Sequence, residues 1–166
     1  MKRLLILLLL GCMTSSLLKA KIPYFENDTL LRSDLEVVWP MVLTVKVEYD
    51  LANAQLEFLQ TKQEKDHFME EFESFIKDKY FHQVMALNYH QGKLLVLLIH
   101  RQLKKTPYDL LREYRNIWRA NFWQRFARLF GANLKEEYYP DEYPVLEREI
   151  IHLQKAGIEL LNGTQP

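Results

Sequence analysis

The chain of 166 residues contains little cysteine, glycine or serine, and each scarcity argues against a kind of chemistry. Cys12 is the only cysteine, so the chain cannot close a disulfide on itself. The five glycines are scattered, and none belongs to a glycine-rich loop that could cradle a phosphate. Beyond residue 20 the only serines are Ser33 and Ser74, and neither lies in the Gly-x-Ser-x-Gly turn of a hydrolase. A serine, cysteine or nucleotide-dependent enzyme is therefore disfavoured, and we expect no cofactor.

The first twenty residues resemble a secretory signal. Lys2 and Arg3 precede seven unbroken apolar residues, Leu4–Leu10, and small or weakly polar residues follow. Because this run is much shorter than the roughly 20 apolar residues that span a bilayer, we expect no transmembrane segment in the mature chain. The sequence predicts an exported protein that resides in the periplasm or at the outer membrane.

Two routes of processing remain open for this signal. Cleavage after Ala20 would leave a soluble chain that starts at Lys21. Alternatively, Leu9-Leu10-Gly11-Cys12 resembles a bacterial lipobox, in which Cys12 is lipidated and becomes the mature N-terminus. Leu10 is unusual at its place in that motif, so we favour the soluble route.

Positive charge is concentrated in one part of a chain whose formal net charge is zero. The segment from Lys93 to Lys135 holds ten basic residues and two acidic ones, and the rest of the mature chain is acidic. Basic helices packed against acidic helices would explain this division. An anionic component of the envelope, or an anionic partner protein, would explain it as well. We expect no nucleic-acid partner.

The apolar spacing predicts an all-α fold with a single helical domain over residues 40–157. We expect an extended segment over 21–39 before it and a flexible tail over 158–166 after it. Pro40 suits the first position of the first helix, and a second helix is expected over 63–80.

Three further helices complete the five that we expect. Asn88 is a suitable N-cap for the third, and Thr106 with Pro107 opens the fourth, which should end at Gly131. The fifth should run from Pro144 to Gly157. The third is apolar on nearly every side and the fourth on two sides, so we expect these two to form the central buried pair.

The chain also resembles an uncharacterised bacterial family of small exported proteins. The block from Phe122 to Gly131 carries most of the likeness, and further matching residues are Gln91-Gly92-Lys93-Leu94-Leu95, Leu98-Ile99, Tyr108-Asp109-Leu110, Leu134-Lys135 and Tyr138. The chain departs from the family at His100-Arg101-Gln102, where an acidic residue, arginine and glutamate are expected. The resemblance implies a Gram-negative envelope location, and it supplies no functional residue.

A metal site is an alternative suggested by two Glu-x-x-His patterns on predicted helices. The first is Glu64 with His67, and the second is Glu149 with His152. Two such pairs and glutamates from two other helices can hold a di-iron or di-manganese centre in a helical bundle. Glutamate and histidine are also common on helix surfaces, so we favour chance spacing and expect no metal.

The basic side of the fourth helix is the candidate binding surface. Arg112, Arg115 and Arg119 share a face at spacings of three and four, and arginine suits bidentate recognition of phosphate or carboxylate. Ion pairs with acidic residues of the second helix are the alternative that we favour. Arg125 lies beside an apolar stripe, so we expect it to be partly buried and paired with a carboxylate or with helix-end carbonyls.

The loop over residues 136–143 is rich in tyrosine and acidic residues and could present aromatic rings to a glycan or peptidoglycan fragment. Tyrosines next to Pro140 and Pro144 more often fix a loop to its domain, so we favour that interpretation. The sequence as a whole indicates a non-catalytic interaction or assembly module of the envelope. A di-metal redox protein and a glycan-acting protein are the alternatives.

Overall fold

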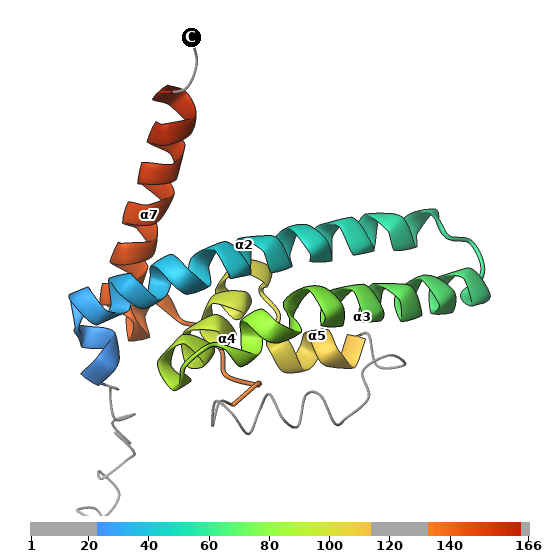
Figure 1. Ribbon diagram of the computed structural model, residues 1–166, viewed down its shortest axis with the longest axis horizontal. Helices are drawn as coiled ribbons and strands as arrows, with labels where there is room; N and C mark the ends of the chain where they lie inside the picture. The colour runs from blue at the N-terminus through green and yellow to red at the C-terminus, as the bar shows by residue number, and fades with distance from the viewer. Residues whose placement is uncertain (1–22, 114–132, 164–166) are drawn as a thin grey trace, which may run out of the picture.

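The computed structural model describes residues 23–113 and 133–163, and every regular element within these ranges is a helix. The prediction of an all-α fold with about five helices is confirmed (Figure 1). The elements are η1 (Pro23–Glu26), α2 (Asp28–Phe58), α3 (Lys62–Met85), α4 (Tyr89–Leu103), α5 (Pro107–Glu113), η2 (Pro140–Glu142) and α7 (Pro144–Gly163).

Helix α2 begins earlier than expected, so the prediction of an extended segment over 21–39 is wrong from Asp28 onward. The Asn27 side chain caps the helix by accepting a hydrogen bond of 3.2 Å from the backbone N–H of Leu30. Pro40 lies inside the helix rather than at its start. Proline cannot donate to the Glu36 carbonyl, but Glu36 and Pro40 are both exposed, so water can replace the missing donor.

The core lies between α2 and α4, which form the principal packed pair of the described residues. A central buried pair is therefore present. Among the described residues it consists of α2 and α4, and not of the third and fourth helices as expected. Apolar residues of α2 stay buried on both sides of Pro40. The fully buried side chains come from α2, α4 and α7 and include Leu31, Leu35, Val38, Val42, Leu94, Val96, Leu97, Leu98, Leu146 and Ile150.

Side-chain caps start the next helices close to where the sequence predicts. Thr61 and Glu64 form a capping box at the start of α3, and Asn88 forms another with Gln91 at the start of α4. Thr106 accepts a 3.1 Å hydrogen bond from the backbone of Asp109 at the start of α5. The rest of the fourth helix, up to Gly131, lies outside the described residues.

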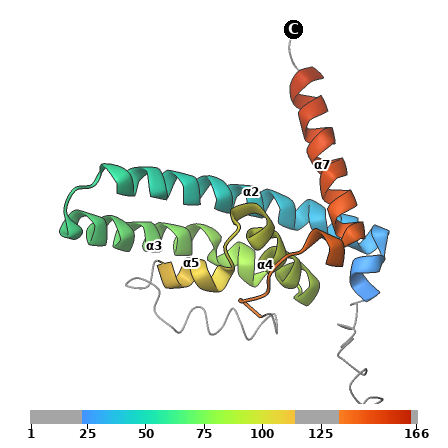
Figure 2. The same cartoon turned by 180° about the vertical axis from the view of Figure 1, so that it is seen from behind.

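Helices α2 and α3 form a long antiparallel hairpin that extends away from the core (Figures 1 and 2). A second, smaller apolar cluster holds this hairpin together around Met69, with Tyr49, Leu56 and Phe68 packed against it. Lys79 of α3 also donates a 2.6 Å hydrogen bond to Glu48 of α2.

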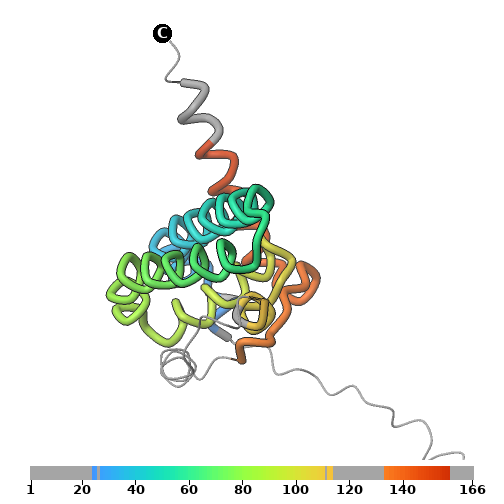
Figure 3. The backbone as a smooth tube through the Cα atoms, turned by 90° about the vertical axis from the view of Figure 1, so that its right-hand side faces the viewer, coloured from blue at the N-terminus to red at the C-terminus, as the bar shows by residue number. Residues whose placement is uncertain are grey.

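Helix α7 crosses the N-terminal end of α2 and extends beyond it, on the side away from α3, α4 and α5 (Figures 1 and 3). It continues to Gly163, so the predicted end at Gly157 is wrong. A side chain added at Gly157 would meet no atom within 4 Å, which shows that this part of α7 stands in open space. None of the helices in the described ranges is long and apolar enough to cross a membrane.

Candidate functional site

The two Glu-x-x-His pairs do not come together. Glu64 completes the capping box of α3, and His67 is exposed and lies 3.5 Å from Glu71 on the same helix. Glu149 and His152 belong to α7, at the opposite end of the molecule from the start of α3 (Figure 1). Within residues 23–113 and 133–163, no three histidine, cysteine, aspartate or glutamate side chains are grouped so that they could hold a metal ion.

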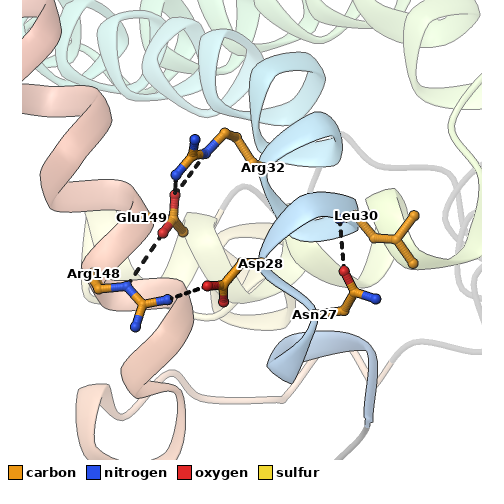
Figure 4. A network of polar contacts seen from close by, with 6 residues as sticks. All are labelled: Asn27, Asp28, Leu30, Arg32, Arg148 and Glu149. Atoms are coloured by element: carbon orange, nitrogen blue, oxygen red, sulfur yellow. Dashed lines mark hydrogen bonds and ion pairs between the residues drawn. The ribbon is translucent and has the colours of Figure 1, made fainter.

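Glu149 instead joins α7 to the start of α2 (Figure 4). Its carboxylate is 3% exposed and accepts two hydrogen bonds from Arg32, at 3.0 and 2.8 Å. Arg148 approaches the other Glu149 oxygen at 3.4 Å and pairs with Asp28 at 2.9 Å. The hydrogen bonds from Arg32 lower the pKa of Glu149, so this buried carboxylate stays charged and fixes the direction of α7.

We expect Arg32→Met to lower the free energy of unfolding by about 1–3 kcal/mol, because it removes two hydrogen bonds from a buried carboxylate. Arg148→Met is the matched control: its contact with Glu149 is longer, so the loss should be under about 1 kcal/mol. Urea denaturation at pH 7 measures both variants. Equal losses of unfolding free energy in the two variants would show that the Arg32 hydrogen bonds stabilise the fold no more than the contacts of Arg148.

A second buried network joins α4, the 136–143 loop and α7. Arg101 donates two hydrogen bonds to Glu147, at 2.8 and 2.6 Å, and the Tyr138 hydroxyl donates a third at 2.7 Å. The Arg101 guanidinium also lies 6.0 Å from the ring centroid of Trp39. His100 accepts a 2.9 Å hydrogen bond from the backbone of Tyr138, which fixes the loop from the other side.

The tyrosines of this loop face the domain rather than presenting a binding surface. The rings of Tyr138 and Tyr143 stack at 5.5 Å, and Tyr143 meets Phe25 edge to face at 5.2 Å. Burial raises the pKa of Tyr143 to about 12. Tyr139 is the exposed exception, and its hydroxyl donates to Glu137. The loop is thus fixed to the domain, which disfavours the glycan-binding interpretation.

The predicted arginine surface lies mostly beyond the described part of the chain. Arg112 lies in the last turn of α5 and is exposed, as a binding role requires. Arg115, Arg119 and Arg125 lie outside the described residues, as does Cys12. Binding of an anion by the three-arginine face, burial of Arg125 and lipidation of Cys12 therefore stay predictions.

The sequence reasoning missed an exposed apolar surface on α2. Residues on the face of α2 opposite the core follow one another at alternating spacings of three and four. At 100° per residue this face lies about 180° from the buried face. We call it the outer stripe; it consists of Leu30, Ser33, Val37, Pro40, Thr44, Val47, Leu51, Ala54 and Phe58.

The large side chains of the outer stripe are strongly exposed. The exposed fractions are 56% for Leu30, 47% for Val37, 55% for Val47, 61% for Leu51 and 77% for Phe58. Single exposed apolar residues are ordinary, but a row of them along one helix marks an interaction surface. The alternating spacing can be recognised in the sequence. The prediction that residues 21–39 are extended excluded Leu30, Ser33 and Val37 from it.

Two open grooves flank the junction of α2 and α7. One, of about 290 Å³, is lined by Asp28, Thr29, Arg32, Ser33 and Glu36. The other, of about 530 Å³, runs along α7, with Arg148, Ile151, His152 and Lys155 among its lining residues. Both are wide open, and among the described residues that line them no hydroxyl donates a hydrogen bond to a carboxylate or histidine. The arrangement supports contact with another macromolecule better than chemistry on a small substrate.

Residues 19–151 match the family described as Domain of unknown function (DUF4294), and the chain belongs to this family. No curated protein and no solved structure matches the chain. Several residues that carry the family resemblance make internal contacts. Gln91 completes the capping box of α4 and donates to Asp34 at 2.7 Å. The backbone N–H of Asp109 donates to the Thr106 cap of α5, and the Tyr138 hydroxyl donates to Glu147. These residues maintain the fold.

Proposed function

We propose that the chain is an exported, non-catalytic interaction or assembly module of the cell envelope. The observation that carries the proposal is the outer stripe, an apolar face that runs the length of the 31-residue helix α2 and points away from the core. Burying such a face in a partner releases about 25 cal/mol for each Å² of apolar surface removed from water. An exposed apolar face of this length is typical of a protein that binds a partner through it.

The roles of the polar residues support the same proposal. Glu147 and Glu149, the most enclosed described carboxylates of α7, are both held by arginine, so neither is available as a general base. The pKa of Glu147 is lowered by its hydrogen bonds from Arg101, whereas a general base needs a pKa near the working pH. A di-metal redox function has no grouped ligands to support it among the described residues.

Export rests on the N-terminal sequence. Lys2 and Arg3 followed by Leu4–Leu10 form the basic and apolar parts of a secretory signal. A domain whose stability depends on helix packing and ion pairs rather than on disulfides is compatible with an oxidising compartment, since Cys12 is the only cysteine.

A photo-crosslinking amino acid placed at Leu51 tests the proposal in cells of the native host. We expect covalent adducts from Leu51, which is 61% exposed on the outer stripe, and none from the matched position Lys77, which is exposed on α3. Cell fractionation of the same samples should place the adducts in the envelope. No adduct from Leu51, or equal adducts from both positions, would contradict the interaction function, and an adduct confined to the cytosol would contradict export.

A further inference from the structure

We propose that the outer stripe joins two copies of this chain in a symmetric, antiparallel dimer, with α7 of each copy beside the end of the partner's α2. The proposal rests on the interaction function above and names the partner. The average spacing of 3.5 residues along the outer stripe is the spacing that keeps two helices in contact over several turns. A two-fold dimer is the commonest way in which one self-complementary surface is used.

The distribution of large and small residues along the outer stripe favours the antiparallel orientation. In one antiparallel register Phe58 faces Ser33 of the partner subunit, Leu51 faces the partner's Pro40, and Val37 faces the partner's Ala54. The central layers pair Thr44 with Val47 of the partner subunit. Each layer then holds one larger and one smaller side chain, which packs evenly. A parallel pair would instead place Phe58 against Phe58 and Ser33 against Ser33.

The position of α7 agrees with this orientation. By its spacing and exposure, the outer stripe lies on the face of α2 opposite the core. The extension of α7 lies on the side of α2 away from α3, α4 and α5 (Figures 1 and 2). Lys155 follows Glu149 by six residues, which places it about 9 Å further along α7 at 1.5 Å per residue. Packed helices have axes about 8–10 Å apart, so Lys155 lies at the height of a second helix on the outer stripe.

The charges beside the outer stripe favour placing the C-terminal end of the partner's α2 next to α7. Glu36 and Glu57 lie on the flank of the outer stripe nearest to α7, and both are exposed. The antiparallel register brings Glu57 of the partner subunit close to Glu36, and a like-charged pair alone would oppose association. Lys155 is exposed on α7 at this place, so it supplies the opposite charge. In the parallel orientation Glu57 of the partner subunit would lie at the far end of α2, out of its reach.

The expected contact is modest in size. Residues 33–58 overlap in this register, which is about 39 Å of helix and, at a helix width of about 10–12 Å, about 850 Å² over both copies. Contacts from α7 add to this area. Stable interfaces bury about 1,200 Å² or more, so the dimer should dissociate on dilution.

Sedimentation over a range of concentrations tests the association, and stripe variants test the surface. We expect reversible dimerisation, weakened at least tenfold by Val47→Ser with Leu51→Ser. Phe75→Ser, which removes a ring that is 45% exposed on α3, should leave it unchanged. A chain that stays monomeric at all concentrations would overturn the dimer, while crosslinks from Leu51 to a different protein would still uphold the interaction function. A chain that stays monomeric and also gives no crosslinks from Leu51 would overturn both the dimer and the interaction function.

Orientation and charge have separate tests. A spin label can be placed at Gln55, which is exposed on α2. In the antiparallel dimer the two labels should lie about 29 Å apart along the helix axis. In a parallel dimer they would lie side by side, separated only by the distance of about 10 Å between the helix axes. Lys155→Glu and Glu57→Lys should each weaken association several-fold, and the double variant should restore it. A short label distance, or a double variant as weak as the single ones, would overturn the proposed arrangement.

Discussion

Leu35→Ala is expected to lower the free energy of unfolding by about 2–5 kcal/mol, the range found for truncation of a fully buried leucine. Leu35 is 0% exposed and lies in the core between α2 and α4. Truncating its isobutyl side chain to a methyl group would leave a cavity among side chains that belong to two different helices. Chemical denaturation followed by circular dichroism measures the change.

Val37→Ala is the matched control, two residues further along the same helix. Val37 is 47% exposed on the outer stripe, so its truncation should change stability by no more than about 0.5 kcal/mol in the monomer. The contrast is specific to a helical backbone before Pro40, because in an extended strand residues 35 and 37 would point to the same side. Similar losses at the two positions would contradict the described start of α2.

Local signals in the sequence predicted where most helices begin. Asn88 and Thr106 act as N-caps as expected, and the helix predicted over 63–80 lies within α3. These signals succeed because a cap satisfies backbone donors within three residues, and no distant contact is needed. Pro40 misled the prediction, since proline suits the first position of a helix but is also tolerated on an exposed face inside one.

The end of α7 also shows that a local sequence signal can mislead a prediction. Gly157 was expected to end the helix, but a glycine does so only where the chain turns into the left-handed conformation. Among the described non-glycine residues, Lys104 at the end of α4 is the one with a positive φ, 56°, although its side chain gives no hint of this in the sequence. Tertiary context decides which potential stop is used.

The polar contacts that position α7 could not be predicted from the sequence. Arg32 and Glu149 are separated by 117 residues, and a charge pair over that distance leaves no local pattern. Leu146 and Ile150, which neighbour Glu149 on α7, are fully buried, and Glu149 is buried with them. The residue that meets it depends on the path of α2, which was assigned incorrectly at this point.

The second large effect concerns Arg101. Arg101→Met should lower the free energy of unfolding at pH 7 by about 2–4 kcal/mol, somewhat less than the 3–5 kcal/mol typical of breaking a fully buried pair. The side chains of Arg101 and Glu147 are 14% and 22% exposed, so water compensates part of the loss. The variant would leave Glu147 with the Tyr138 hydroxyl as its remaining described donor.

The loss should depend on pH in a defined direction. Hydrogen bonds from Arg101 lower the pKa of Glu147 in the folded chain, so the stabilisation is fully present above the usual glutamate pKa, about 4.3, and disappears as the pH falls through the lowered value. The difference between wild type and Arg101→Met should therefore shrink between about pH 5 and pH 3. Arg101→Lys keeps the charge but loses the two-pronged geometry, so it should recover only part of the stability. A difference that stays constant with pH would show that Arg101 acts through its packing on Trp39 rather than through Glu147. Full recovery with lysine would show that the charge, and not the two-pronged geometry, provides the stability.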